Sequence, residues 1–220
     1  MITLSRIGLG NGHAVMINYD GTRTYDQVVN GPSQFALAGT NVFAASTGGR
    51  VKTFCVELNE GFEDGDLVYT ATDLGGVPEH QPPGNMTMAK QVIMQDLYAR
   101  WYDSIFTHSF TEMNDVAAAF QLLVWEISHE SFTSETDASS GVAEMSLSAG
   151  AMAATDFGGS AVSALVQDMI DSLGDGGFRA DYRVLGLTNP DSQDMLIVVP
   201  SPAVIGLAGL GLVGLRRRRR

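Results

Sequence analysis

The sequence predicts an α+β protein with a β-sandwich or barrel-like core, a helical insertion and a short C-terminal transmembrane helix. Three observations predict this fold. Short segments with alternating apolar residues fill residues 2–58, and similar segments return at 182–199. Helical spacing of apolar residues dominates the middle of the chain, between about residues 86 and 173. An order of strands, then helices, then strands is typical of an α+β domain.

The expected strands lie mostly in the first third of the chain. They are Ala14–Tyr19, Gln34–Leu37, Asn41–Ala45, Arg50–Leu58 and Leu67–Thr70, separated by Asp-Gly, Asn-Gly and Gly-Gly turn signals. In the strand Arg50–Leu58, Cys55 and Glu57 share one face because side chains alternate along a strand. A last hairpin pairs Tyr182–Leu187 with Asp194–Val199 around Thr-Asn-Pro-Asp.

Three helices are expected between these groups of strands. The first covers Met86–Phe106, and the third covers Ser160–Leu173 and ends at Gly174. The second begins at Asn114 as the N-cap and runs to about Ser128. The stretch from Ser131 to Gly159 is rich in Ser, Ala, Gly and Thr, and its weak periodicity predicts a mobile excursion.

Length and charge limit the possible functions. The 220 residues suffice for one domain with its own core, which we expect over residues 1–199, followed by a tail over 200–220. Five of the 13 basic residues end the chain, so the rest holds 8 basic against 25 acidic residues. Such an acidic body repels nucleic acid and anionic membranes and attracts cationic partners, so we expect no nucleic-acid partner.

The tail has three parts. Pro200 and Pro202 end the domain, since proline cannot continue a strand or sit inside a helix. Ala203–Leu215 is uncharged but shorter than the roughly 20 residues of a permanent membrane span. The chain ends in a basic cluster that keeps the terminus in the cytoplasm, Arg216, Arg217, Arg218, Arg219 and Arg220. This order favours a segment held briefly in the membrane, and a permanent anchor is the alternative.

The tail resembles the PEP-CTERM family of bacterial sorting signals, with Ser201 where the commonest form has Glu. The resemblance implies processing by an exosortase-type membrane transpeptidase and transient insertion in the inner membrane of a Gram-negative bacterium. It also implies delivery to the cell surface or to a biofilm matrix. Export predicts an N-terminal signal peptide, but residues 1–19 lack the usual apolar run. We therefore expect a misassigned start or a fragment.

Cys55 is the only cysteine, so no internal disulfide can form, and an unpaired thiol in an exported protein needs an explanation. It lies in Phe-Cys-Val-Glu, while Gln121 lies among large apolar residues in Phe-Gln-Leu-Leu-Val-Trp. From residue types alone, the simplest interpretation is a cysteine that fills the core and a glutamine bonded to backbone, because a buried carboxamide needs partners.

Together the two stretches resemble the paired signatures of bacterial thioester domains, which are adhesin modules of surface proteins. The likeness covers about residues 50–129 and places Gln121 66 residues after Cys55. It implies that the Cys55 thiol attacks the Gln121 side-chain carbonyl, expels ammonia and leaves a thioester. A lysine amine of a target would then open this bond, which is single-turnover adhesion rather than enzyme catalysis and needs no cofactor.

Further residues have expected roles beside this pair. Trp125, one helical turn beyond Gln121, would shield the bond from water. Glu57 and His129 are candidates for proton transfer, although such residues are more often solvated or capping. The remaining histidines show no ligand spacing, so we expect no metal site.

Two alternatives remain open. One is a non-covalent structural surface or matrix protein with the same sorting tail and no thioester. The other is a hydrolase that uses Cys55 with a histidine, but neither a Cys–His motif nor an oxyanion-type glycine loop adjoins Cys55.

Overall fold

The computed structural model describes residues 1–21, 24, 26–27, 33–58, 60–63, 65–79 and 84–199. The expectations for the tail, namely the motif Pro200, Ser201 and Pro202, the apolar span and the arginine cluster, lie outside the described residues. Within the described ranges, no helix has both the length and the apolar character needed to cross a membrane.

The described chain has a mixed α+β architecture, which confirms the expected fold class at that level. Its strands are β1 (Ile2–Tyr19), β2 (Gln34–Ala45), β3 (Arg50–Cys55), β4 (Asp66–Thr72), β5 (Met152–Asp156), β6 (Arg183–Thr188) and β7 (Met195–Val199). Its α-helices are α1 (Met88–Trp101), α2 (Phe110–His129), α3 (Ala138–Glu144) and α4 (Ser160–Ser172). Two 3-10 helices, η1 (Leu74–Gly76) and η2 (Asp103–Phe106), complete the described elements.

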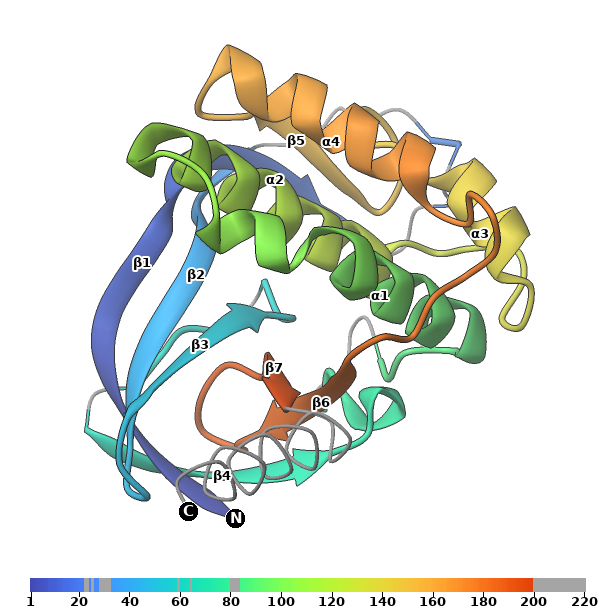
Figure 1. Ribbon diagram of the computed structural model, residues 1–220. Coiled ribbons are helices and arrows are strands. Elements are labelled where there is room, and N and C mark those ends of the chain that lie inside the picture. The colour runs from blue at the N-terminus through green and yellow to red at the C-terminus, as the bar shows by residue number, and fades with distance from the viewer. Residues whose placement is uncertain are drawn as a thin grey trace, which may run out of the picture.

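The strands form one antiparallel sheet that closes on itself. Its order is β2-β3-β7-β6-β4-β1-β5, and an additional pairing of β1 with β2 joins six of the strands into a ring. The helices gather at one end of this barrel, and the long strands β1 and β2 reach from the barrel into the helical layer (Figure 1). Helix α2 packs there against β1, β2, β3 and α4, so it lies at the centre of the core.

Strand β1 is longer than expected. It begins at Ile2 rather than Ala14, and the two strands expected between Gln34 and Ala45 are one continuous strand. Glycines broke the alternating pattern in the sequence, but here they let two strands approach closely. Gly12 pairs with Gly39 at a register shift, and a Cβ atom on Gly12 would lie 2.2 Å from the Ala38 carbonyl oxygen.

Helix α2 begins at Phe110, earlier in the chain than the expected N-cap Asn114. Ser109 is the N-cap, and its backbone N–H donates to the Glu112 carboxylate at 3.0 Å in a capping box. Asn114, the expected cap, lies inside the helix. Its Oδ1 accepts from Asn11 Nδ2 at 3.1 Å and from the Gly12 N–H at 3.3 Å, so this residue ties α2 to the glycine-rich part of β1.

The segment Ser131–Gly159, expected to be an excursion with little structure, contains α3 and β5. Buried carboxylates at the end of α2 hold it in place. Glu126 Oε1 accepts from the Ser146 N–H at 2.8 Å, and Glu130 Oε2 accepts from the Ala151 N–H at 3.0 Å. Part of what orders the segment is therefore polar contact with α2, which leaves no hydrophobic period in the sequence.

Candidate functional site

The end of strand β3 leaves backbone groups of Cys55 without a strand partner on one side. Strand β2 pairs with β3 only as far as Asn41 opposite Thr53. On the other side, β7 pairs with β3 at Met195, and the Val56 N–H donates to the Asp194 carbonyl at 3.0 Å. Because neighbouring residues of a strand direct their polar groups to opposite sides, the N–H and C=O of Cys55 face the side that β2 has left.

The carboxamide of Gln121 completes this edge from helix α2. Its Oε1 accepts from the Cys55 N–H at 3.0 Å, and its Nε2 donates to the Cys55 carbonyl at 2.8 Å. The Gln121 side chain is fully buried, so these two bonds satisfy groups that would be costly to leave unpaired. They also hold the carboxamide against the backbone of the residue that carries the thiol.

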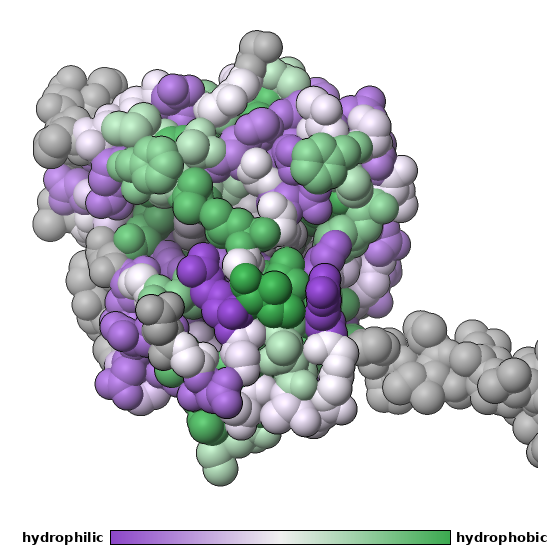
Figure 2. Space-filling view, turned by 90° about the vertical axis from the view of Figure 1, so that its left-hand side faces the viewer, coloured by the Kyte–Doolittle hydropathy of each residue, from purple (hydrophilic) through white to green (hydrophobic). Residues whose placement is uncertain are grey.

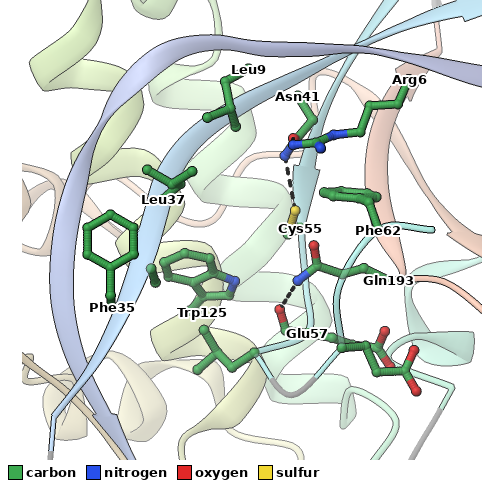
Figure 3. Close-up of a pocket in the computed structure, with 13 residues that line it drawn as sticks. Arg6, Leu9, Phe35, Leu37, Asn41, Cys55, Glu57, Phe62, Trp125 and Gln193 are labelled. Carbon is green, nitrogen blue, oxygen red and sulfur yellow. Dashed lines mark hydrogen bonds between the residues drawn. The ribbon is translucent and has the colours of Figure 1, made fainter. Parts of the chain in front are cut away.

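The sulfur of Cys55 has its own polar partner on β2. Asn41 Nδ2 donates to Cys55 Sγ at 3.1 Å, and Asn41 Oδ1 accepts from Arg6 Nη2 at 3.4 Å (Figure 3). A guanidinium has donors only, so Arg6 selects the amide orientation in which Asn41 offers its N–H to the sulfur. This chain of contacts connects a positive charge on β1 to the thiol on β3.

The ionisation of Cys55 is set by opposing influences. Burial raises the pKa of the Cys55 thiol far above its ordinary value. The Arg6 charge and the Asn41 hydrogen bond lower that pKa, and the Glu57 charge raises it. The resting group is therefore the neutral thiol, while Arg6 and Asn41 stabilise negative charge on sulfur whenever it develops.

Cys55 opens onto a pocket of about 270 Å³. One wall carries the apolar side chains of Leu9, Phe35 and Leu37, and Trp125 lies beside Phe35 and Leu37 with its indole nitrogen toward Glu57 and Gln193 (Figure 3). Only 3% of Trp125 is exposed, and its Nε1 has no hydrogen-bond partner among the described residues. The indole is therefore buried in the lining of the pocket and keeps one donor there without a described partner.

Glu57 lines the same pocket two residues beyond Cys55. It is almost fully buried, its Oε2 accepts from the Asp194 N–H at 2.7 Å, and its backbone carbonyl accepts from Gln193 Nε2. Burial raises the pKa of the Asp194 carboxyl to about 7, and the nearby Glu57 charge contributes to this rise. Hydrogen bonding therefore fixes the Glu57 side chain at the pocket, where it is buried and not solvated.

His129 is buried outside this pocket. Its Nδ1 donates to the Trp125 carbonyl at 3.1 Å and lies 2.8 Å from Ser128 Oγ, and its ring meets that of Tyr19 edge-on at 4.7 Å. Burial lowers the pKa of His129 to about 3. A role in proton transfer to Cys55 has no contact to support it and stays a prediction.

The structure thus brings four predicted residues to one place, Cys55, Gln121, Trp125 and Glu57. Sequence reasoning missed Asn41 and Arg6, and Asn41 entered it only as the first residue of the expected strand Asn41–Ala45. The contact of Asn41 with the Cys55 sulfur depends on the pairing of β2 with β3, which the sequence does not reveal.

Comparisons with known proteins give one structural similarity. Neither protein-family models nor curated protein sequences match the chain. The N-terminal domain of the Streptococcus pyogenes pilus tip adhesin Cpa is similar, with 13% sequence identity and a TM-score of 0.40. This similarity covers 89% of the present chain and 100% of the other chain.

Proposed function

We propose that Cys55 and Gln121 form an internal thioester through which the protein attaches covalently to an amine on a target. The observation that carries this proposal is the pair of hydrogen bonds between the Gln121 carboxamide and the Cys55 backbone, at 3.0 and 2.8 Å. They bring the reacting residues together from β3 and α2, and such positioning replaces a bimolecular encounter. Each molecule would react once, so the protein is an adhesive rather than an enzyme.

Formation of the thioester joins Cys55 Sγ to the side-chain carbon of Gln121 and breaks the bond from that carbon to Nε2. The thiol proton passes to the departing nitrogen, which leaves as ammonia. During attack, negative charge develops on Gln121 Oε1, which already accepts from the Cys55 N–H. The Asn41 amide and, through it, Arg6 favour the thiolate form of the sulfur.

Attachment reverses the role of the sulfur. A neutral amine of the target bonds to the Gln121 carbon, the carbon–sulfur bond breaks, and one amine proton returns to Cys55. The sulfur is now the leaving group, and the Asn41 donor stabilises the charge that it gains. Lysine is the favoured nucleophile, because the acidic body attracts cationic surfaces.

We further propose that residues 200–220 sort the protein to the surface or matrix of a Gram-negative bacterium. Support comes from the sequence alone, through the order of Pro200, Ser201, Pro202, the apolar run and the arginines. The partner would be an exosortase-type membrane transpeptidase. Replacing the five arginines by Ser should leave the protein uncleaved or misplaced, as judged by the mass and cell fraction of the product, and unchanged processing would contradict this.

A second candidate function is a non-covalent structural protein of the surface or matrix. One observation favours it: the Gln121 carboxamide satisfies both free backbone groups of Cys55, which is a complete structural role for this residue. In that case the buried thiol is an ordinary core group.

Methylamine labelling separates the two candidates. The intact protein is incubated with methylamine, digested and mapped by mass spectrometry, with Cys55→Ala as the control. The thioester predicts one methylamide located at Gln121 in the wild type and none in the variant. Absence of the label from both proteins would leave only the structural role.

A further inference from the structure

Within the proposed thioester function, we propose that the pocket selects its target as well as reacting with it. The favoured target is a lysine in an extended segment of another protein, with a large apolar residue two positions away. Three features of the pocket carry this inference: an apolar wall, an acidic end and an unpartnered indole donor.

The apolar wall is exposed beside the reactive pair. The side chains of Leu9, Phe35 and Leu37 are 48%, 66% and 44% exposed, although they belong to the strands that flank the core. Phe35 and Leu37 lie on one face of β2, since side chains two apart share a face. Apolar surface extends across the face of the molecule on the β1 and β2 side (Figure 2). Gathered apolar groups of this kind mark interaction sites.

The opposite side of the pocket is polar. Glu57 and Glu60 line it, and both would attract an ammonium group toward the end of the pocket that also contains Cys55. Arg6 also lines the pocket, where its guanidinium lies 4.7 Å from the centre of the Phe62 ring and bonds to Asn41, so the described lining holds two acidic groups and one basic group. An occupant that matches both sides is therefore cationic at one point and apolar at another.

The indole of Trp125 adds a requirement for an acceptor. Its Nε1 is buried, lacks a hydrogen-bond partner among the described residues, and faces the side of the pocket where Cys55, Glu57 and Gln193 lie (Figure 3). A buried donor without an acceptor is costly, and a peptide carbonyl beside the lysine would supply one. Small amines such as methylamine supply neither a carbonyl nor an apolar group.

An extended peptide fits these features in one arrangement. Its lysine enters toward Cys55, and residues two positions away point to the same side and meet the wall formed by Leu9, Phe35 and Leu37. The lysine nitrogen, once neutral, bonds to the Gln121 carbon, the carbon–sulfur bond breaks, and one nitrogen proton goes to the Cys55 sulfur. The wall thus sets which lysines reach the bond.

Two blocked pentapeptides test the inference on the intact protein, Leu-Ala-Lys-Ala-Leu and Ser-Ala-Lys-Ala-Ser. Covalent adducts are followed by mass spectrometry over time, with methylamine as a nucleophile that needs no recognition. We expect the leucine peptide to react about fivefold faster or more, the gain from partial burial of one or two apolar side chains. Equal rates for the two peptides, with methylamine still incorporated, would overturn the inference and leave the thioester intact. No methylamine adduct would instead reject the proposed function itself.

Two variants test whether the apolar wall causes the difference between the two peptide rates. Leu37→Ser should bring the ratio of the two peptide rates close to one. Phe110→Ser is the matched control, because Phe110 is 72% exposed at the start of α2 and does not line the pocket. An unchanged ratio in Leu37→Ser, or an equal loss in Phe110→Ser, would contradict the assignment of the wall.

Discussion

The carboxamide of Gln121 pairs with the backbone of Cys55 as a neighbouring strand would, through bonds of 3.0 and 2.8 Å. Strand β2 leaves β3 after Thr53, and the helix α2 supplies the missing partner through one side chain. The same contact that completes the sheet edge also holds the carboxamide against the backbone of the residue that carries the thiol. Structure and proposed chemistry therefore depend on one pair of residues.

Removal of the Gln121 carboxamide should destabilise the fold even when no thioester can form. We expect Cys55→Ala/Gln121→Ala to lose about 3 kcal/mol of unfolding free energy relative to Cys55→Ala, because two buried backbone groups lose their partners. Chemical denaturation of the two variants measures the difference. A loss below about 0.5 kcal/mol would mean that the two hydrogen bonds do not support the sheet edge.

Asn41→Ala should slow both formation and opening of the thioester. The variant loses the donor to Cys55 Sγ, and a hydrogen bond to a charged group contributes about 1.5–3 kcal/mol, or roughly 10–100-fold in rate. The rate of methylamine incorporation measures the effect. Arg6→Gln keeps a donor for Asn41 but removes the charge, so its rate should fall between those of the wild type and Asn41→Ala. A wild-type rate in Asn41→Ala would exclude a role of Asn41 in stabilising charge on the sulfur.

Trp125 should protect the thioester from water. Its side chain is 3% exposed, and it lines the same pocket as Cys55. We expect Trp125→Leu to convert the thioester to free thiol and Glu faster, as water reaches the Gln121 carbon. Incubation of purified protein, followed by intact mass over days, gives the hydrolysis rate. Hydrolysis at the wild-type rate would show that other groups exclude the water.

His129 should make the fold sensitive to acid. Burial lowers its pKa to about 3 from 6.5, so between these values the unfolded chain binds a proton that the folded chain does not. Stability from this residue is complete above about pH 6.5 and is lost as pH falls. At about pH 5 the loss is about 2 kcal/mol.

Comparison with His129→Gln isolates this effect from other groups. Asp194 and Glu126 have raised pKa values and act in the opposite direction, but both are present in each protein. Denaturation at about pH 7.5 and about pH 5 should therefore show a larger loss in the wild type than in the variant. An equal loss would show that His129 is protonated in the folded protein or does not titrate in this range.

Local patterns in the sequence predicted the elements but not their pairing. The apolar stripe of α2 and the alternation of the later strands were sufficient to predict the α+β class. The first half of β1 was not predicted, because Gly8, Gly10 and Gly12 interrupt its apolar alternation. The close pairing of β1 with β2 accounts for these glycines, and it is visible only in the structure. Local periodicity carries no information about which strands lie side by side.

In the candidate site, too, some residues could be found from local motifs, and others depend on how the strands pair. Cys55 and Gln121 were connected by resemblance to a pair of motifs, because a separation of 66 residues has no geometric meaning along the chain. Asn41 and Arg6 reach the sulfur only through the pairing of β1, β2 and β3. The pocket wall likewise depends on how the long strands cross α2, which no single segment determines.

The intact mass of the purified protein tests the central claim most directly, with Cys55→Ala measured beside it under the same conditions. The thioester predicts a wild-type mass lower than the sequence mass by one ammonia, and a variant with its full sequence mass. A wild-type protein with full mass and a free thiol at Cys55 would contradict the account.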